Sequence, residues 1–199
     1  MKQITSTLTA CILLIAMISC SKEESRTTAQ GDITGTYKFV SLQAKTSSTA
    51  QTMSGSDIIK TVAISDYTTQ NNTGTVIIDA NKMISTNLAY SINSTVFGTL
   101  YENGVVTDTF SSPFQVTLPA TSGASPYKKI GADSLYFASG SSLTGAAAAA
   151  TLPGGAKIKF ENGKLMLYGN FAQSTTTTNQ GATVTTVATA AIVTTLQKQ

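Results

Sequence analysis

Apolar and polar residues alternate along short runs of this chain, and the runs are separated by tight-turn signals. In the run 83–92 the even-numbered residues from Ile84 to Ile92, Thr86 included, are expected to share one face, with Ser85 and Asn87 on the other. A period of two is the signature of a β-strand with one buried face. Because this pattern recurs from Gly35 onward, it constrains the fold more than any other feature.

Asn-Gly pairs mark where consecutive strands are expected to turn back. Asn103-Gly104 and Asn162-Gly163 each follow an alternating run, and Asn-Gly is the strongest short hairpin signal because both residues tolerate positive φ. Tight turns are also expected at 79–81 and at Asn93-Ser94. Longer loops are expected at Thr68–Thr73, Thr121–Ser125, Ser139–Gly155 and Thr175–Thr178, with a short helical turn at Ala146–Ala150.

These signals predict one all-β domain over residues 33–199, with about ten strands and a closing strand at Ala182–Leu196. Nearest-neighbour hairpins make an antiparallel meander, and open sheet edges invite association. An up-and-down β-barrel is the simplest closed arrangement. A two-sheet β-sandwich is the alternative.

The N-terminus has the organisation of a signal peptide. Lys2 precedes an apolar run from Leu8 to Ile18, and about eleven apolar residues are too few to span a bilayer, which takes about 20. Residues 1–19 are therefore expected to be a signal peptide. The polar segment 20–32 lacks large apolar side chains after its first residue and is expected to be a tether.

The junction between these segments resembles the lipobox of bacterial lipoproteins. Residues 17–20 read Met-Ile-Ser-Cys, and the resemblance implies that Cys20 is acylated after cleavage. The following Lys22, Glu23 and Glu24 resemble the export signal of surface-exposed lipoproteins of the Bacteroidetes. Several acyl chains on one cysteine give stable anchoring. The resemblance thus implies an outer-membrane protein, lipid-anchored and facing the cell exterior, with its membrane contact made through the N-terminal acyl chains.

Composition excludes several classes of function. The chain has no histidine, and its two cysteines are Cys11 in the signal peptide and the acylated Cys20, so catalysis by Ser-His-Asp or Cys-His groups is excluded. The net charge of +3 comes mainly from scattered lysines, which argues against nucleic-acid binding. The least explained acids are Asp57, Asp66 and Asp108. They do not suggest a paired catalytic or metal-binding set, so no enzyme activity, cofactor or metal is expected.

The start of the domain resembles the first strand of lipocalin-like lipoproteins. Lipocalins open with Gly-x-Trp, whose ring plugs the closed end of the barrel, and here Gly35 and Tyr37 occupy two positions of that motif. The resemblance implies non-catalytic binding of a small apolar ligand or an envelope component. The residues expected to face the interior are Tyr37, Phe39, Leu88, Tyr90, Phe114, Leu165 and Leu167.

Glycan binding or adhesion is the alternative function. Sugar platforms use exposed aromatic rings, and without tryptophan the candidates are Tyr67, Tyr127 and Tyr136, which lie near expected loops or strand ends. Half-buried strand tyrosines with hydroxyls in water are the simpler interpretation of the same residues. Separately, Asp133-Ser134-Leu135 resembles a short O-glycosylation acceptor motif, which makes Ser134 a candidate modification site.

Overall fold

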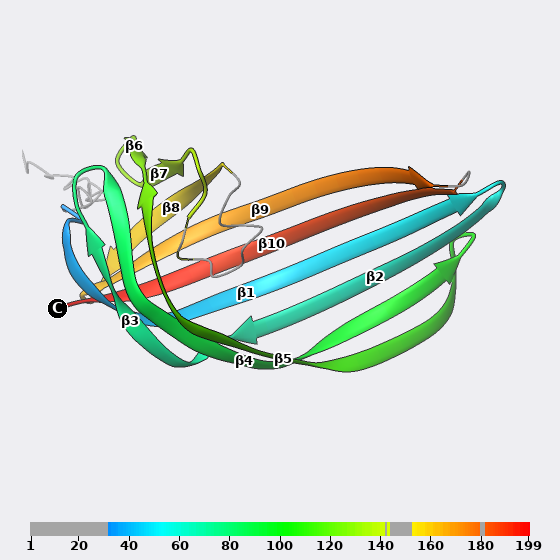
Figure 1. The fold of residues 1–199 in the computed structure, drawn as a ribbon, viewed down its shortest axis with the longest axis horizontal. Coiled ribbons are helices and arrows are strands. Elements are labelled where there is room, and N and C mark those ends of the chain that lie inside the picture. Colours follow the sequence, from blue (N-terminus) through cyan, green and yellow to red (C-terminus); the bar gives the residue numbers. More distant parts are fainter. Residues whose placement is uncertain (1–31, 142, 144–152, 180–181) are drawn as a thin grey trace, which may run out of the picture.

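The computed structural model describes residues 32–141, 143, 153–179 and 182–199, and these residues form one antiparallel sheet of ten strands (Figure 1). The all-β expectation is confirmed, and no α-helix occurs within these ranges. The strands are β1 (Gly35–Ser54), β2 (Asp57–Thr68), β3 (Gln70–Ile78), β4 (Lys82–Glu102), β5 (Val105–Pro126), β6 (Lys128–Ile130), β7 (Ser134–Phe137), β8 (Gly154–Glu161), β9 (Lys164–Asn179) and β10 (Ala182–Lys198).

The first and last strands are neighbours, because β1 pairs with β10 along nearly its whole length. From β10 the pairing continues through β9, β8 and β7 to β6, and on the other side of β1 it continues through β3 and β2 to β4 and then β5. Only Thr69 separates β2 from β3, and only Tyr127 separates β5 from β6. The two ends of the strand order, β5 and β6, are therefore consecutive in the chain.

The long strands extend well beyond the short ones and divide the molecule into two regions (Figure 1). We call residues 45–66, 94–114, 170–179 and 182–191 the arm, since there β1, β2, β4, β5, β9 and β10 run on without β6, β7 or β8. The remaining described residues form the compact end. Strands of 20, 21 and 22 residues in β1, β4 and β5 account for the length of the arm.

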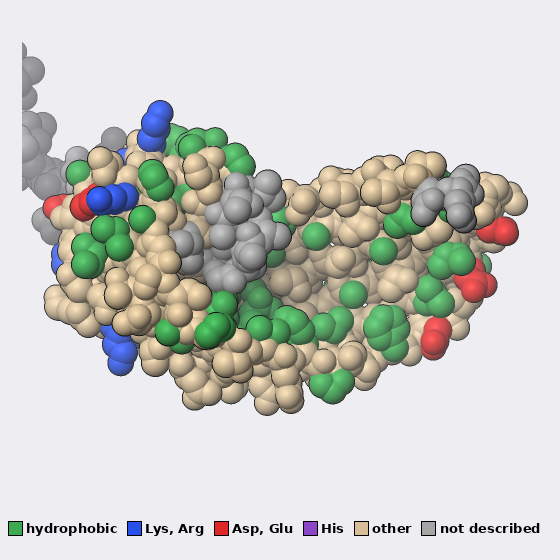
Figure 2. All heavy atoms as spheres, in the orientation of Figure 1, with side chains coloured by type: hydrophobic (Ala, Val, Ile, Leu, Met, Phe, Trp, Pro, Cys, Tyr) green, Lys and Arg blue, Asp and Glu red, His purple; other side chains and the backbone are tan. Residues whose placement is uncertain are grey.

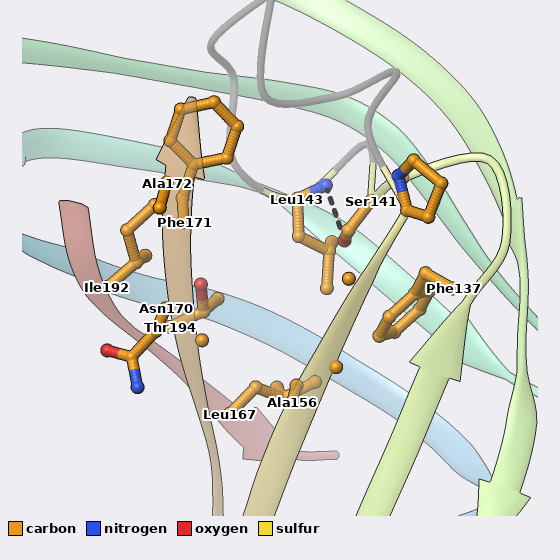
Figure 3. A pocket seen from close by; sticks show the side chains of 15 residues that line it. Phe137, Ser141, Leu143, Ala156, Leu167, Asn170, Phe171, Ala172, Ile192 and Thr194 are labelled. Atoms are coloured by element: carbon orange, nitrogen blue, oxygen red, sulfur yellow. Dashed lines mark hydrogen bonds between the residues drawn. The ribbon is translucent and has the colours of Figure 1, made fainter. Parts of the chain in front are cut away.

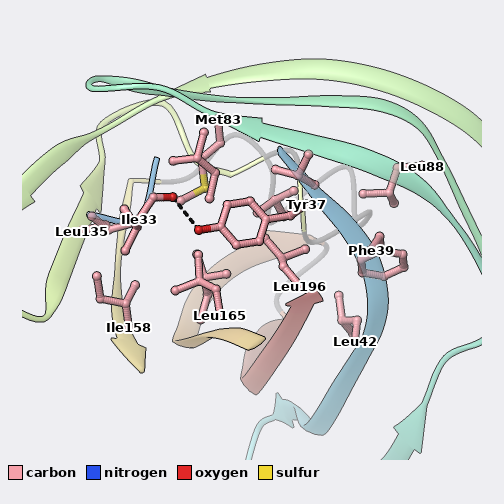
Figure 4. Packing of buried hydrophobic residues seen from close by; sticks show 14 of the residues in the cluster. Ile33, Tyr37, Phe39, Leu42, Met83, Leu88, Leu135, Ile158, Leu165 and Leu196 are labelled. Carbon is pink, nitrogen blue, oxygen red and sulfur yellow. Dashed lines mark hydrogen bonds between the residues drawn. The ribbon is translucent and has the colours of Figure 1, made fainter. Parts of the chain in front are cut away.

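The hydrophobic core lies entirely in the compact end, where every buried apolar side chain of the described residues is found. In Figure 4 Leu165 and Leu196 surround the Tyr37 ring, and all three side chains are inaccessible to solvent. Burying a side chain of this size contributes about 1.5–3 kcal/mol. Six of the seven expected interior residues are buried, namely Tyr37, Phe39, Leu88, Tyr90, Leu165 and Leu167. The seventh, Phe114, is half-buried at the border with the arm.

Three of the expected turns are confirmed. Asn103-Gly104 joins β4 to β5 and Asn162-Gly163 joins β8 to β9, with positive φ at all four residues. The 79–81 turn joins β3 to β4, and the Asp79 carboxylate accepts hydrogen bonds from the backbone N–H groups of residues 81 and 82.

Other expected turns and loops are wrong, because they lie inside strands. Asn93-Ser94 is in the middle of β4, Thr121–Ser125 is in β5, and Thr175–Thr178 is in β9. In the segment Thr68–Thr73 only Thr69 is outside a strand. Threonine-rich runs resemble loops in composition, but the β-branched side chain suits an extended, paired backbone.

The face expected for the run 83–92 is also wrong for the first residues of the run. Ser85, not Ile84 or Thr86, faces the core, and Ser85 is only 3 % exposed. The pairing register of β4 with β5 shifts between Ser85 and Leu88, and Asn87 within that interval has a φ of 52°. Such a bulge moves the following residues to the opposite face. Leu88, Tyr90 and Ile92 at the end of the run are buried, as expected.

The long loop expected at Ser139–Gly155 lies only partly within the described residues. The strand β7 ends before it and β8 takes up its last two residues, so its described part is a connection between these strands. The expected helical turn at Ala146–Ala150 lies outside the described residues, as do the signal peptide, Cys20 and the residues Lys22, Glu23 and Glu24. Among the described residues, none forms a helix long and apolar enough to cross a membrane.

Candidate functional site

A cavity of about 230 Å³ lies where the compact end meets the arm. The strand β7 ends at Phe137 and β8 begins at Gly154, whereas β9 and β10 continue into the arm. Figure 3 shows Phe137 and Leu143 on one side of the cavity, with Phe171 of β9 and Ile192 of β10 on the other. The cavity thus occupies the step between the short and the long strands.

Three small residues leave space in the wall of this cavity. Gly154 pairs with Phe137, and Ala156 pairs with Leu135 on one side and with Gly169 on the other. Paired residues on neighbouring strands point to the same face of a sheet. Because Leu135 and Phe137 point into the core, positions 154, 156 and 169 face inward as well. A larger apolar side chain at any of these positions would fill part of the cavity.

The chemistry of the cavity is apolar and uncharged. None of the described residues that line it has an ionisable side chain. Its polar groups include the hydroxyl of Thr194, a residue that is 4 % exposed, and that of Ser141, which accepts a hydrogen bond from the backbone N–H of Leu143 at 3.3 Å. A site of this composition suits an uncharged apolar molecule and offers no group for acid–base chemistry.

The inner face of the arm continues the cavity side of the sheet. The strand pairing runs from β1, which carries the buried Ala44, through β2 and β4 to β5, and it places Leu100 and Phe110 on this same face. The Phe110 ring lies against Gly98. A side chain at position 98 would displace that ring, so the glycine permits the observed packing. Figure 2 shows a hollow beside the compact end and hydrophobic side chains scattered along the arm.

The tyrosines proposed as a glycan platform do not form one surface. Tyr127 is 7 % exposed, and its hydroxyl donates to the backbone carbonyl of Asp79 at 2.6 Å. Tyr67 packs against Phe114 with 5.8 Å between ring centroids, and burial raises the pKa of its hydroxyl. Tyr136 is 37 % exposed and lies on the outer face of β7, opposite Gly155.

Tyr37 of the expected barrel-closing motif lies at the base of the core (Figure 4). Its hydroxyl donates a hydrogen bond of 2.7 Å to the backbone carbonyl of Ile33, and Lys198 lies 6.0 Å from the centre of its ring. Gly35 has a φ of 138°, and a Cβ there would lie 3.2 Å from the Lys198 side chain. Nearby in the core, burial raises the pKa of Tyr90 to about 12.

The remaining candidate residues are dispersed. Ser134 begins β7 and donates a hydrogen bond of 3.0 Å from its hydroxyl to the Asp133 carboxylate. Asp57 and Asp108 belong to different hairpin tips of the arm, and Asp66 forms an ion pair with Lys45 at 3.4 Å. The described residues include no group of three or more His, Cys, Asp or Glu side chains that could hold a metal ion.

Of the cavity residues, sequence reasoning identified only Leu167, as one of the expected interior residues. Phe171 and Ile192 face it from β9 and β10, and the glycines and Ala156 that make room for it are paired with one another only in the folded sheet. The closely spaced small residues at 154–156 were the available signal. Family models, curated proteins and solved structures that were compared with the chain include no match.

Proposed function

We propose that this chain is a lipid-anchored outer-membrane protein that holds a small, uncharged apolar molecule in the cavity between its compact end and its arm. The observation that carries the proposal is the apolar lining of that cavity, which has Phe137, Leu143, Phe171 and Ile192 on its walls. The anchor is proposed from the N-terminal sequence, with Cys20 as the acylated residue and Lys22, Glu23 and Glu24 as the signal for display on the cell exterior.

A lipocalin-like up-and-down barrel is part of this proposal. If β2 with β3, and β5 with β6, are each taken as one interrupted strand, the sheet consists of eight consecutive strands whose first and last members pair. An eight-stranded barrel is wide enough to be filled by side chains or to hold one small ligand. In this protein the base is filled around Tyr37, so the ligand would lie above the packed core.

The size of the cavity limits the ligand. At about 230 Å³ it exceeds the roughly 150 Å³ of an engineered apolar cavity that binds benzene. It falls below the roughly 300–1,000 Å³ of typical sites for drug-sized molecules. A small aromatic or branched molecule, or one segment of an acyl chain, fits these limits.

The test is binding of the uncharged fluorescent probe N-phenyl-1-naphthylamine to the full-length protein. The variant Ala156→Leu fills the cavity and is expected to reduce the probe affinity at least tenfold. Ala191→Leu is the matched control, because the same enlargement at this exposed position of β10 lies on the outer face and should leave the affinity unchanged.

Three further measurements keep the test decisive. Thermal unfolding of Ala156→Leu establishes that the variant is folded, and Ile192→Ala, which enlarges the cavity, should retain probe binding. Equal affinity of the folded Ala156→Leu variant and the unchanged protein would contradict the proposal. Native mass spectrometry of protein extracted from membranes should show a co-purifying apolar molecule that is lost in Ala156→Leu.

A further inference from the structure

Charge is distributed unevenly between the two regions. The compact end carries lysines at positions 38, 82, 128, 129, 157, 159, 164 and 198 against acids at positions 32, 79, 133 and 161. The arm carries two lysines against four acids. In Figure 2 the lysines visible in this view all lie at the compact end, and the acids visible on the arm gather at its far end. The molecule is therefore positive at one end and negative at the other.

The lysines of the two regions also differ in what they contact. In the arm, Lys45 forms an ion pair with Asp66, and the ammonium of Lys60 lies 4.3 Å from the centre of the Tyr101 ring. At the compact end only Lys82 and Lys159 are in ion pairs among the described residues. Lys198 lies 6.0 Å from the centre of the Tyr37 ring, and the other five are exposed and available to an external anion. Of these five, Lys128 and Lys129 form a consecutive pair on β6.

The chain enters the described structure at this positive end. The preceding 31 residues join at Asp32, whose carboxylate is close enough to Lys129 and Lys198 for both to help lower its pKa, after the larger effect of hydrogen bonds from Thr34. Any membrane attachment through the N-terminal segment is therefore connected to the domain at its lysine-rich end. The hairpin tips at residues 54–57 and 102–105 are at the opposite end of the same long strands.

We infer that the lysine-rich compact end, with Lys128 and Lys129 beside the point of chain entry, docks onto anionic phospholipid headgroups of a membrane surface. Positive charge meets negative phosphate there, and the acidic end of the arm is repelled from the same surface. The arm is thereby directed away from the membrane. This inference rests on the proposed anchor for its biological setting, but the docking itself does not need acyl chains.

The test uses the full chain carrying Cys20→Ala, which removes the proposed acylation site. Partition onto vesicles of phosphatidylglycerol and phosphatidylcholine in equal parts is compared with partition onto phosphatidylcholine alone. The apolar N-terminal run is the same in every variant, so neutral vesicles measure its contribution. We expect clear preference for the anionic vesicles at about 0.02 M salt and its loss at about 0.5 M, where screening extends over only a few ångströms.

Two double variants with equal loss of net charge separate docking from general attraction. In the background of Cys20→Ala, Lys128→Gln with Lys129→Gln should weaken partition onto anionic vesicles about thirtyfold. Lys45→Gln with Lys60→Gln removes the same charge from the arm and should change it less than twofold. Equal losses in the two pairs, or no preference for anionic vesicles, would overturn the inference.

A final control experiment distinguishes docking on a membrane surface from binding at a phosphate site. Inorganic phosphate should release the protein no more than chloride does at the same ionic strength. Selective release by phosphate would overturn the docking inference. Because probe binding in the cavity is measured without vesicles, its failure and the failure of docking are separate results.

Discussion

The compact end and the arm consist largely of the same strands, yet they are stabilised in different ways. In the compact end one face of each long strand is covered, and all buried apolar side chains of the described residues are there. In the arm the described residues other than Ser65 and Gly98 are exposed or half-buried, and hydroxyl pairs such as Thr176 with Thr185, at 3.2 Å, link neighbouring strands. Backbone pairing can therefore carry a sheet beyond its core, but packing energy is concentrated where the face is covered.

The largest expected effect comes from comparing two positions on β10. Leu196 is completely buried and Val187 is 39 % exposed. Leu196→Ala removes packed atoms and should lower the free energy of unfolding by about 3 kcal/mol, within the usual range of 2–5. Val187→Ala should change it by less than about 0.5 kcal/mol. Urea denaturation of both full-length variants measures the difference, and similar losses would show that the arm is packed as tightly as the core.

The features of this two-part fold that could be predicted from the sequence are those that local patterns encode. The Asn-Gly hairpins at residues 103 and 162 and the alternation from Leu88 to Ile92 are local, and these predictions are confirmed. The arm was missed because Thr175–Thr178 has the composition of a loop, and its extended state depends on pairing with β10. The face of Ser85 was missed because a single bulge at Asn87 reverses the alternation without any change in composition.

The candidate cavity depends on register and could not be predicted from one sequence. Gly154, Ala156 and Gly169 leave space together because β8 pairs with β7 on one side and β9 on the other. The interior expected around Tyr37 was identified correctly, since its residues alternate within single strands. Local patterns therefore predicted the packed base, whereas the hollow above it needed the pairing of three strands.

A smaller effect is expected from removing single hydroxyl groups in the two regions. The buried hydroxyl of Tyr37 donates to the backbone carbonyl of Ile33 at 2.7 Å, so Tyr37→Phe leaves that acceptor without its partner. The expected loss in the free energy of unfolding is about 1–2 kcal/mol. In the arm, Tyr101→Phe retains the ring beside Lys60 and should cost less than about 0.5 kcal/mol.

Chemical denaturation of these two variants provides the measurement. An unchanged stability for Tyr37→Phe would mean that water replaces the hydroxyl at the base of the core. A large loss for Tyr101→Phe would instead indicate that its hydroxyl has a structural role at the tip of the arm.

The smallest effect is expected at the turns, where the two regions use different acceptors. In the compact end the Asp79 carboxylate accepts from the backbone N–H groups of Asn81 and Lys82, at 3.0 and 2.8 Å, and these bonds hold its pKa below the ordinary range, with Lys82 adding a favourable charge. In the arm the amide oxygen of Asn103 accepts from the N–H of Ile58 at 2.9 Å and does not titrate.

Because the folded pKa of Asp79 is lowered, the contribution of its carboxylate to stability is complete above the unfolded value of about 3.9 and is lost as the pH falls through the folded pKa. The Tm difference between the unchanged protein and Asp79→Asn should therefore be a few degrees or less at about pH 6 and disappear in strong acid, whereas the difference for Asn103→Ala should not depend on pH. Thermal unfolding followed by circular dichroism between about pH 6 and pH 2 measures both, and a pH-independent effect of Asp79→Asn would show that the carboxylate charge does not stabilise this turn.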